Sequence, residues 1–300
     1  MVIVTNVDTE ADLIKEVEMP KERSLKREKK SSNEYLMESE EETIRLEVKT
    51  DPEALRKQAI WCGVKPGMRV LDAGCGPGIT TAILHEMVQP GGSIVGIDYS
   101  RERINYAKEH YGNKSGIEFR IQDFRQPMDE LGQFDLVWVR FVLEYYRKEA
   151  LQIVNNLKKA VKPGGFLCLL DLDYNCLSHY ELSPEMEKIL PKIMKNMDDK
   201  YNFDTYIGRK LYSLLYDTGF ENIEIDLMPH NLFYGDIKEK DLYNLSKKIE
   251  IAAQKAKKII NSYPGGQNKF ANDLKKYFND QKSFSYTPLL LCKGVRSFMS

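Results

Sequence analysis

The stretch Val70-Leu71-Asp72-Ala73-Gly74-Cys75-Gly76-Pro77-Gly78 decides the fold. An apolar run changes abruptly into three alternating glycines, and a segment able to form a helix follows them. This order predicts the first strand of an α/β sheet, a sharp turn and the first helix. Glycine permits the positive φ of a tight turn, and because it lacks Cβ it lets a ligand lie against the backbone. The loop therefore predicts a ligand site at the carboxyl end of a strand.

A second strand that ends in an acid follows at the distance that a nucleotide site requires. After a predicted helix over 80–89, the run Ser93–Asp98 predicts a short strand whose last carboxylate lies about twenty residues beyond Gly78. A carboxylate at this place can accept hydrogen bonds from both hydroxyls of a ribose. We therefore expect Asp98 to bind the ribose of a nucleotide-like ligand.

Three further segments continue the alternation of strands and helices. The run 117–122 predicts a third strand, and Asp123 and Phe124 follow it as an acceptor for an exocyclic amine beside an apolar ring. A fourth strand is predicted over 134–139. The turn Lys162-Pro163-Gly164-Gly165 leads into a fifth strand over 166–170. Strands that alternate with helices in this way predict an α/β fold.

Taken in order, these features resemble the class I S-adenosylmethionine-dependent methyltransferases. The resemblance rests on the glycine loop, Asp98, Asp123, Phe134-Asp135-Leu136-Val137 and Lys162-Pro163-Gly164-Gly165, and it covers about residues 64–172. It implies a Rossmann-like α/β sheet of seven strands in the order 3-2-1-4-5-7-6, with the last strand antiparallel and helices on both faces. It also implies S-adenosyl-L-methionine as the cofactor.

Several side chains are candidates to contact that cofactor. The rings of Tyr99 and Phe124 can lie on the adenine. By the resemblance, Tyr35 and Arg45 face the amino-acid end, where an arginine suits a carboxylate. Arg140 lies in a stretch that the family places beside the methionyl portion and the methyl group, and its role stays open. The expected cofactor-binding residues are Tyr35, Arg45, Asp72, Gly74, Cys75, Gly76, Gly78, Asp98, Tyr99, Asp123, Phe124 and Arg140.

Charge and composition exclude some classes of partner. The chain carries 44 basic and 45 acidic residues, so no overall positive field favours nucleic acid. No apolar run approaches the roughly eighteen residues that span a bilayer, and the amino terminus lacks the basic start of a secretory signal. The 5 cysteines contain no Cys-x-x-Cys pair and the 4 histidines no His-Glu-x-x-His pair. These patterns favour a reducing, cytoplasmic setting without a metal site.

The first part of the chain divides into three predicted regions. Residues 1–33 are charged and weakly periodic, which predicts a flexible charged arm. By the resemblance, residues 34–64 form amino-terminal helices that fold over the cofactor as a lid. Residues 65–230 are then expected to form the cofactor-binding α/β core.

The last third is rich in helices. Helices are predicted over 183–197 and 206–218, and strands over 221–227 and 285–292. The helical segment 231–283 is longer than a connection requires. We expect it to cap the acceptor side of the site, with an oligomer contact as the alternative. Residues 284–300 then hold the final core strand.

A sulfonium methyl group is already activated, so the protein mainly has to align an acceptor lone pair behind it and exclude water. A hydroxyl acceptor would also need a base. His179, Asp173 and His230 are candidates, and no motif selects one of them, so the catalytic residue stays unknown. The resemblance implies a small-molecule methyl acceptor, and a homodimer is an option.

Three different activities remain open at this point. The first is a nicotinamide-dependent Rossmann oxidoreductase, because Gly74, Gly76 and Gly78 with Asp98 partly match its fingerprint. Against that match, the spacing is Gly-x-Gly-x-Gly, and a carboxylate at Asp72 would repel a pyrophosphate. The second is a protein or nucleic-acid methyltransferase. The third is a non-catalytic module that binds S-adenosylmethionine.

Overall fold

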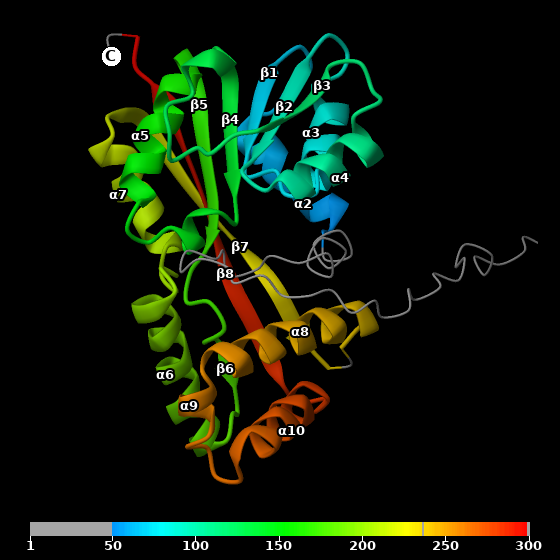
Figure 1. Ribbon diagram of the computed structural model, residues 1–300, viewed down its shortest axis with the longest axis vertical. Coiled ribbons are helices and arrows are strands. Elements are labelled where there is room, and N and C mark those ends of the chain that lie inside the picture. Colours follow the sequence, from blue (N-terminus) through cyan, green and yellow to red (C-terminus); the bar gives the residue numbers. More distant parts are fainter. Residues whose placement is uncertain (1–49, 236, 299–300) are drawn as a thin grey trace, which may run out of the picture. The chain divides into compact units, whose positions relative to one another are not determined.

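The computed structural model describes residues 50–235 and 237–298. They form an eight-stranded sheet with helices packed around it (Figure 1). The predicted α/β fold is confirmed. Tyr35, Arg45, the predicted arm over 1–33 and most of the predicted lid over 34–64 lie outside the described residues.

The strands follow the predicted order with one addition. The parallel strands lie in the order β3-β2-β1-β4-β5, and the last strand, β8, runs antiparallel between β5 and β7. The addition is β6, a short strand that pairs with β8 in line with β5. The strands are β1 (Arg69–Ala73), β2 (Ser93–Asp98), β3 (Ile117–Ile121), β4 (Phe134–Arg140), β5 (Val161–Leu172), β6 (His179–Tyr180), β7 (Phe220–Tyr234) and β8 (Phe284–Arg296).

Helices cover both faces of the parallel strands. Side chains of α2, α3 and α4 pack into one buried cluster, and those of α5 and α7 pack into another on the opposite face. In the central strand β1, Val70 joins the first cluster and its neighbour Leu71 joins the second. The central strands are therefore buried on both faces and read as continuous apolar runs, which is why the sequence predicts them. The helices are α2 (Pro52–Cys62), α3 (Ile79–Val88), α4 (Arg101–Tyr111), α5 (Ala150–Ala160), α6 (Pro184–Lys200), α7 (Leu211–Asp217), α8 (Glu239–Lys255), α9 (Lys257–Ile260) and α10 (Gly266–Phe278).

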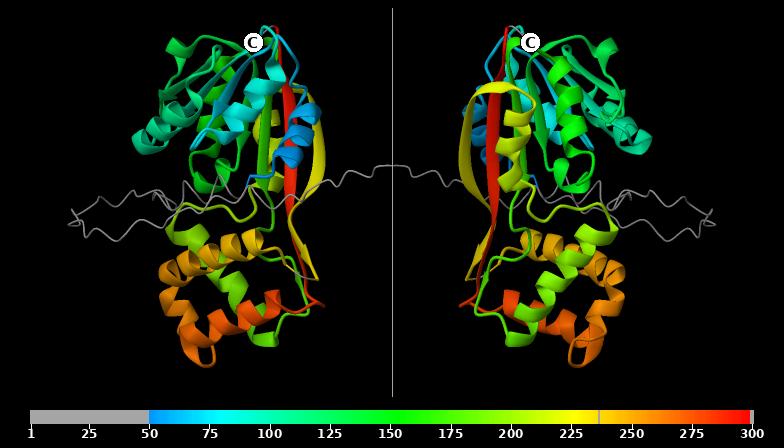
Figure 2. Two further views of the ribbon diagram at one scale, coloured as in Figure 1. Left: turned by 90° about the vertical axis from the view of Figure 1, so that its right-hand side faces the viewer. Right: turned by 90° about the vertical axis from the view of Figure 1, so that its left-hand side faces the viewer.

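Strands β7 and β8 form a long ribbon that carries a group of helices. One edge of β8 pairs with β7 along the length of the ribbon. The other edge of β8 pairs with β5 at the core end and with β6 at the far end. Helices α6, α8, α9 and α10 pack together in a third buried cluster, which includes Phe270 and Phe278 of α10. We call these four helices the cap. Figure 2 shows them gathered on one side of the ribbon.

Strand β7 runs further than the sequence predicts. The predicted strand ends at Leu227, but β7 continues to Tyr234 and so enters the segment predicted as an insertion. A proline within a run argues against a strand, yet β7 includes Pro229. In the structure Pro229 lies opposite Pro288 of β8, and the register shifts between His230 and Phe233. The pairing of β7 with β8 therefore continues beyond both the proline and this irregularity.

The predicted helix over 206–218 is also shorter than expected. It consists of a 3-10 turn, Gly208–Lys210, followed by α7. A Cβ at Gly208 would lie 2.7 Å from the Cβ of Asp173, so the turn packs directly on the chain that leaves β5. Within residues 50–235 and 237–298, the helices are all too short or too polar to cross a membrane.

The glycine loop depends on the chain that follows β4. Gly74 has a φ of 84°, and a Cβ built on it would lie 2.4 Å from Cγ2 of Val142. Gly67 offers a matched comparison, because its φ is 83° and a Cβ there would meet nothing within 4 Å. The two glycines share the same backbone strain, and Gly74 alone adds a steric conflict.

Replacing Gly74 with alanine should therefore lower the free energy of unfolding more than replacing Gly67. We expect a loss of about 1 kcal/mol for Gly67→Ala, from the backbone conformation, and about 3 kcal/mol for Gly74→Ala, where the contact with Val142 adds to it. Urea unfolding of both variants and the wild type measures the difference. Equal losses would show that Val142 moves aside at no cost.

Candidate functional site

A cleft opens at the carboxyl ends of β1, β2 and β4. It encloses about 850 Å³, including space open to solvent, which lies within the range of roughly 300–1,000 Å³ for small-ligand sites. Its walls come from segments 74–77, 79–80, 98–99, 140–142 and 144–146, with Thr50, Arg103 and Phe124. Open α/β sheets bind their ligands at this edge.

The buried carboxylate of Asp98 joins the two loops that form the floor of the cleft. Its Oδ2 accepts a hydrogen bond from the N–H of Gly76 (3.1 Å), and its Oδ1 accepts one from the N–H of Ser100 (2.9 Å). Burial raises the pKa of Asp98, and the charge of Arg103 and these N–H groups oppose the rise. A carboxylate oxygen has two lone pairs. The N–H of Tyr99 forms a further hydrogen bond to this carboxylate, and Nη1 of Arg103 lies 4.0 Å from its Oδ2.

Asp72 lies below the loop and out of the cleft. Only 2% of its surface is exposed, and its Oδ2 accepts a hydrogen bond from the hydroxyl of Thr81 (2.6 Å). Burial raises the pKa of Asp72 to about 7, against the lowering effects of the Thr81 hydrogen bond and the charge of Arg140. Near neutral pH this carboxyl group is therefore partly protonated, and a nearby positive charge would favour its ionised form.

Arg140 brings a positive charge to the wall of the cleft. Its Nε donates to Oε1 of Gln58 on α2 (2.9 Å), and its guanidinium lies 4.1 Å from the ring centroid of Phe141. Burial lowers the pKa of Arg140 to about 10, and the charges of Asp72 and Asp171 oppose this shift. At neutral pH the group stays charged, so it can recognise a carboxylate.

The structure brings most of the expected cofactor residues together, but not all. Seven of them line the cleft: Gly74, Cys75, Gly76, Asp98, Tyr99, Phe124 and Arg140. Asp72, Gly78 and Asp123 do not. Gly78 serves helix packing, since a Cβ there would lie 2.8 Å from Ala107 and 3.0 Å from Phe119. Asp123 is held by Arg125, whose Nη2 donates to Oδ2 at 2.7 Å and whose Nε donates to both oxygens.

Glu144 is a cleft residue that the sequence reasoning did not select. It follows β4 in a 3-10 turn, is 4% exposed and accepts a hydrogen bond from Nδ2 of Asn175 (2.9 Å). Its N–H donates to Asp171, and burial together with the charge of Glu144 raises the pKa of Asp171 well above its usual value. The available signal was an acid within the apolar stretch directly after the fourth strand.

Two of the candidate bases are held by contacts within the protein. The guanidinium of Arg209 donates to both oxygens of Asp173, with Nη2 2.7 Å from Oδ2. Nε2 of His179 donates to the carbonyl of Cys176 (3.0 Å), so Nδ1 accepts from the hydroxyl of Ser285 (2.7 Å). Burial lowers the pKa of His179. Its ring connects β6 to β8.

The third candidate lies closer to the cleft. The ring centroid of His230, on β7, lies 4.9 Å from that of Phe141, which lines the cleft. This contact joins the ribbon of β7 and β8 to the carboxyl end of β4.

A family model of the methyltransferase domain matches residues 64–257. The chain belongs to the class I S-adenosylmethionine-dependent methyltransferase family. This confirms the resemblance read from the glycine loop and the residues after β2, β3 and β4. The matched segment covers every cleft-lining residue except Thr50, the ribbon's first strand and the whole of α8.

Individual relatives of this methyltransferase chain are distant. An uncharacterised methyltransferase of Synechocystis is 34% identical over 110 residues, 36% of this chain and 49% of that protein. A ubiquinone biosynthesis O-methyltransferase of Aliivibrio fischeri is 27% identical over 189 residues, 62% of this chain and 75% of that protein. The chain spans half the length or less of the first three curated relatives.

Solved structures share the methyltransferase fold. A phosphoethanolamine N-methyltransferase of Haemonchus contortus, in complex with phosphomonomethylethanolamine and S-adenosylhomocysteine, aligns with a TM-score of 0.56. The alignment covers 89% of this chain and 60% of that one at 16% identity. At this identity the likeness concerns the fold alone.

The raised pKa of Asp72 predicts how stability changes with pH. Because the folded state holds the proton more tightly than the unfolded state, stability falls as the pH rises from 3.8 to about 7. The loss approaches about 1.4 kcal/mol per pH unit in this window. Asp72→Asn keeps an acceptor for Thr81 and has no such proton. Between pH 5 and 8, the free energy of unfolding of the variant, measured by urea unfolding, should rise by about 2 kcal/mol relative to that of the wild type. Parallel curves would contradict the buried, protonatable carboxyl.

Proposed function

We propose that the chain binds S-adenosyl-L-methionine in the cleft and transfers its methyl group to a small-molecule acceptor. The observation that carries the proposal is the buried carboxylate of Asp98. It is held at the wall of the cleft by the N–H groups of Gly76 and Ser100, and a carboxylate at this place can accept hydrogen bonds from the hydroxyls of a ribose. Membership of the family supports the same cofactor and argues against the nicotinamide alternative.

The remaining walls of the cleft fit the other parts of this cofactor. Tyr99 and Phe124 line the cleft beside Asp98 and provide aromatic surface for an adenine. Arg140 provides a positive charge for the carboxylate of the amino-acid end. Asp123 would reach an adenine amine only if Arg125 moved away, so its predicted role stays a proposal.

The bound cofactor would supply a methyl group on a positively charged sulfur, which needs no further activation. The residues of this chain would then orient the acceptor and exclude water. Phe141, Tyr145 and Tyr146 line the cleft after β4 and present rings on that side. Orientation of this kind contributes up to about 7–11 kcal/mol in the best intramolecular cases. No described side chain is assigned the role of a base.

The acceptor is proposed to approach from the side of the ribbon and cap. Support comes from the contact between Phe141 in the cleft and His230 on β7. The names of the relatives include an O-methyltransferase and N-methyltransferases, so they support a small acceptor without selecting its atom. A cytoplasmic location and a homodimer are proposed from the sequence.

Isothermal titration of S-adenosylhomocysteine tests the cofactor and the role of Asp98. We expect micromolar binding to the wild type and at least about 100-fold weaker binding to Asp98→Ala, because hydrogen bonds to a charged group contribute about 1.5–3 kcal/mol each. Glu118→Ala removes an exposed carboxylate from neighbouring β3 and should leave the affinity unchanged. Thermal unfolding by circular dichroism checks that Asp98→Ala is folded.

Two results would overturn parts of the proposal. A wild type that binds no S-adenosylhomocysteine would exclude the cofactor, and equal affinity in Asp98→Ala would exclude the ribose contact. Incubation with S-adenosyl-L-methionine and a panel of small amines and hydroxyl compounds then tests catalysis. Tight binding without release of S-adenosylhomocysteine on any acceptor would favour the non-catalytic module.

A further inference from the structure

The two faces of the ribbon differ at its cap end. On the inner face, Phe233 lies opposite Ser285 in the ladder. Ser285 Oγ is 3.1 Å from the hydroxyl of Tyr277, and the ring of Phe233 lies 6.2 Å from that of Phe278. Both partners belong to α10, so α10 covers this face. Successive strand residues point to opposite faces, and the residues that alternate with these therefore point outward.

Aromatic side chains cover the outer face at this end. Phe284 lies between Tyr180 of β6 and Tyr234 of β7 in the ladder, and directly opposed residues share a face. Tyr286 follows two residues later on the same face, with its ring centroid 6.0 Å from that of Phe284. The three strands thus present four neighbouring rings away from α10.

The apolar surface continues along the ribbon toward the core. Ile225 and Leu227 of β7 lie opposite Cys292 and Leu290, which are an even number of residues from Phe284 and so share its face. We call this surface the outer stripe. Its members are each exposed by 40 to 67%, and they are Tyr180, Ile225, Leu227, Tyr234, Phe284 and Tyr286.

The area of the outer stripe is at the upper end of the roughly 300–600 Å² that the largest apolar patch on a monomer covers. A buried aromatic side chain covers roughly 150–250 Å², so the exposed fractions of its members amount to on the order of 600 Å². Helix α7 packs on β7 and adds Tyr212 and Tyr216, which are 47% and 66% exposed. The stripe by itself amounts to about three quarters of the roughly 800 Å² that each partner buries in a standard stable interface.

We infer that the outer stripe is the contact surface between two copies of this chain. Within residues 50–235 and 237–298, no strand pairs with the outer edge of β7, so the stripe reaches an open side of the sheet. Flat sheet faces pack on one another about 10 Å apart. A two-fold axis would place the same residues on both sides, as symmetric dimers require.

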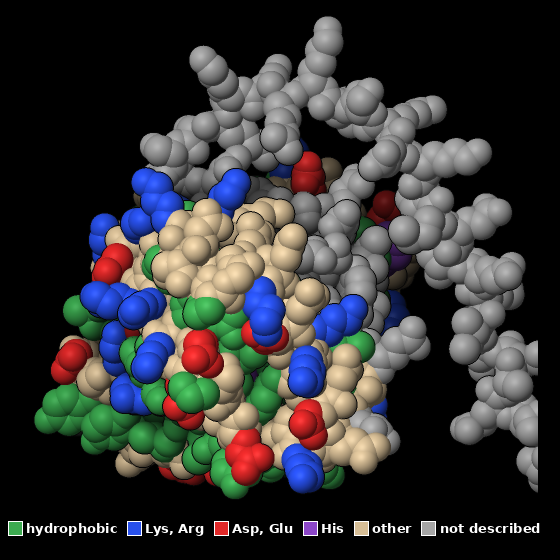
Figure 3. Space-filling model, turned by 90° about the horizontal axis from the view of Figure 1, so that it is seen from below, with side chains coloured by type: hydrophobic (Ala, Val, Ile, Leu, Met, Phe, Trp, Pro, Cys, Tyr) green, Lys and Arg blue, Asp and Glu red, His purple; other side chains and the backbone are tan. Residues whose placement is uncertain are grey.

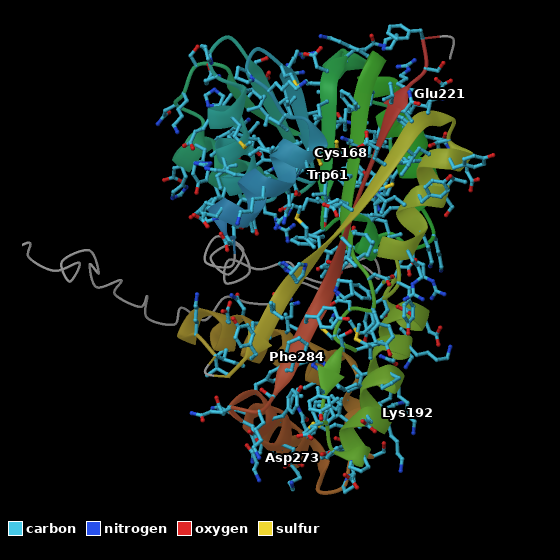
Figure 4. All side chains as sticks on the ribbon, turned by 180° about the vertical axis from the view of Figure 1, so that it is seen from behind. Trp61, Cys168, Lys192, Glu221, Asp273 and Phe284 are labelled. Atoms are coloured by element: carbon cyan, nitrogen blue, oxygen red, sulfur yellow. The ribbon has the colours of Figure 1, made fainter. Side chains whose placement is uncertain are left out.

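The charges at the cap end of the molecule are mixed in sign. Figure 3 shows lysine, arginine and acidic side chains interspersed over the cap face, without a field of one sign. Figure 4 labels Glu221 at the core end of β7 and Phe284, a member of the stripe, on β8 beside the cap. An anionic membrane would select a basic rim.

Sedimentation velocity over a range of protein concentrations tests this inference. The wild type should sediment as a dimer, at twice the 34.7 kDa mass of the chain. Leu227→Lys and Tyr234→Lys should each weaken dimerisation at least 10-fold, because each places a charge in an apolar contact. The matched control is Ile60→Lys on α2, since Ile60 is 67% exposed, as Tyr234 is, and lies off the stripe.

A failure of the dimer contact can be distinguished from a failure of the proposed function. None of these residues lines the cleft, so all three variants should keep the wild-type affinity for S-adenosylhomocysteine and a cooperative thermal unfolding transition, although loss of the dimer lowers the midpoint of the stripe variants. A monomeric wild type, or a dimer that survives both stripe substitutions, would overturn the inference. A monomer that co-sediments with phosphatidylglycerol vesicles would also overturn it and assign the stripe to lipid.

Discussion

The carboxylate of Asp98 is the contact on which the candidate site depends. It lies at the end of β2, yet its two oxygens hold the N–H of Gly76 from the loop after β1 and the N–H of Ser100 at the start of α4. A buried carboxylate is stable only when its oxygens have such donors. One side chain therefore sets the glycine loop relative to the neighbouring strand and lines the cleft.

Burial makes the charged forms of the ionisable groups around the cleft less stable than they are in water. It raises the pKa of Asp72 to about 7 and lowers that of Arg140 to about 10, and the charge of each partly offsets the shift of the other. Of these two groups only Arg140 lines the cleft, whereas Asp72 lies below the glycine loop. A ligand carboxylate in the cleft would therefore stabilise the ionised form of Arg140.

The ribbon of β7 and β8 links the α/β core to the cap. Leu289 and Leu291 of β8 lie in a core cluster, whereas Ser285 of the same strand contacts α10 and His179. The facing prolines Pro229 and Pro288 lie between these two regions. One strand pair therefore positions the cap over the sheet edge and leaves an apolar outer face.

The sequence by itself determined the strands, the glycine loop and Asp98, because continuous apolar runs and glycine spacing are local signals. It did not reveal that β7 continues beyond Pro229, that Arg125 donates hydrogen bonds to Asp123, or that Glu144 lines the cleft. Each of these depends on a partner that only the folded chain supplies: a ladder with β8, a neighbouring guanidinium, or the burial of a turn against β5. Tertiary contacts of this kind decide which strands pair, which side chains are protonated and which residues are exposed, and the local periodicity of the sequence does not indicate these contacts.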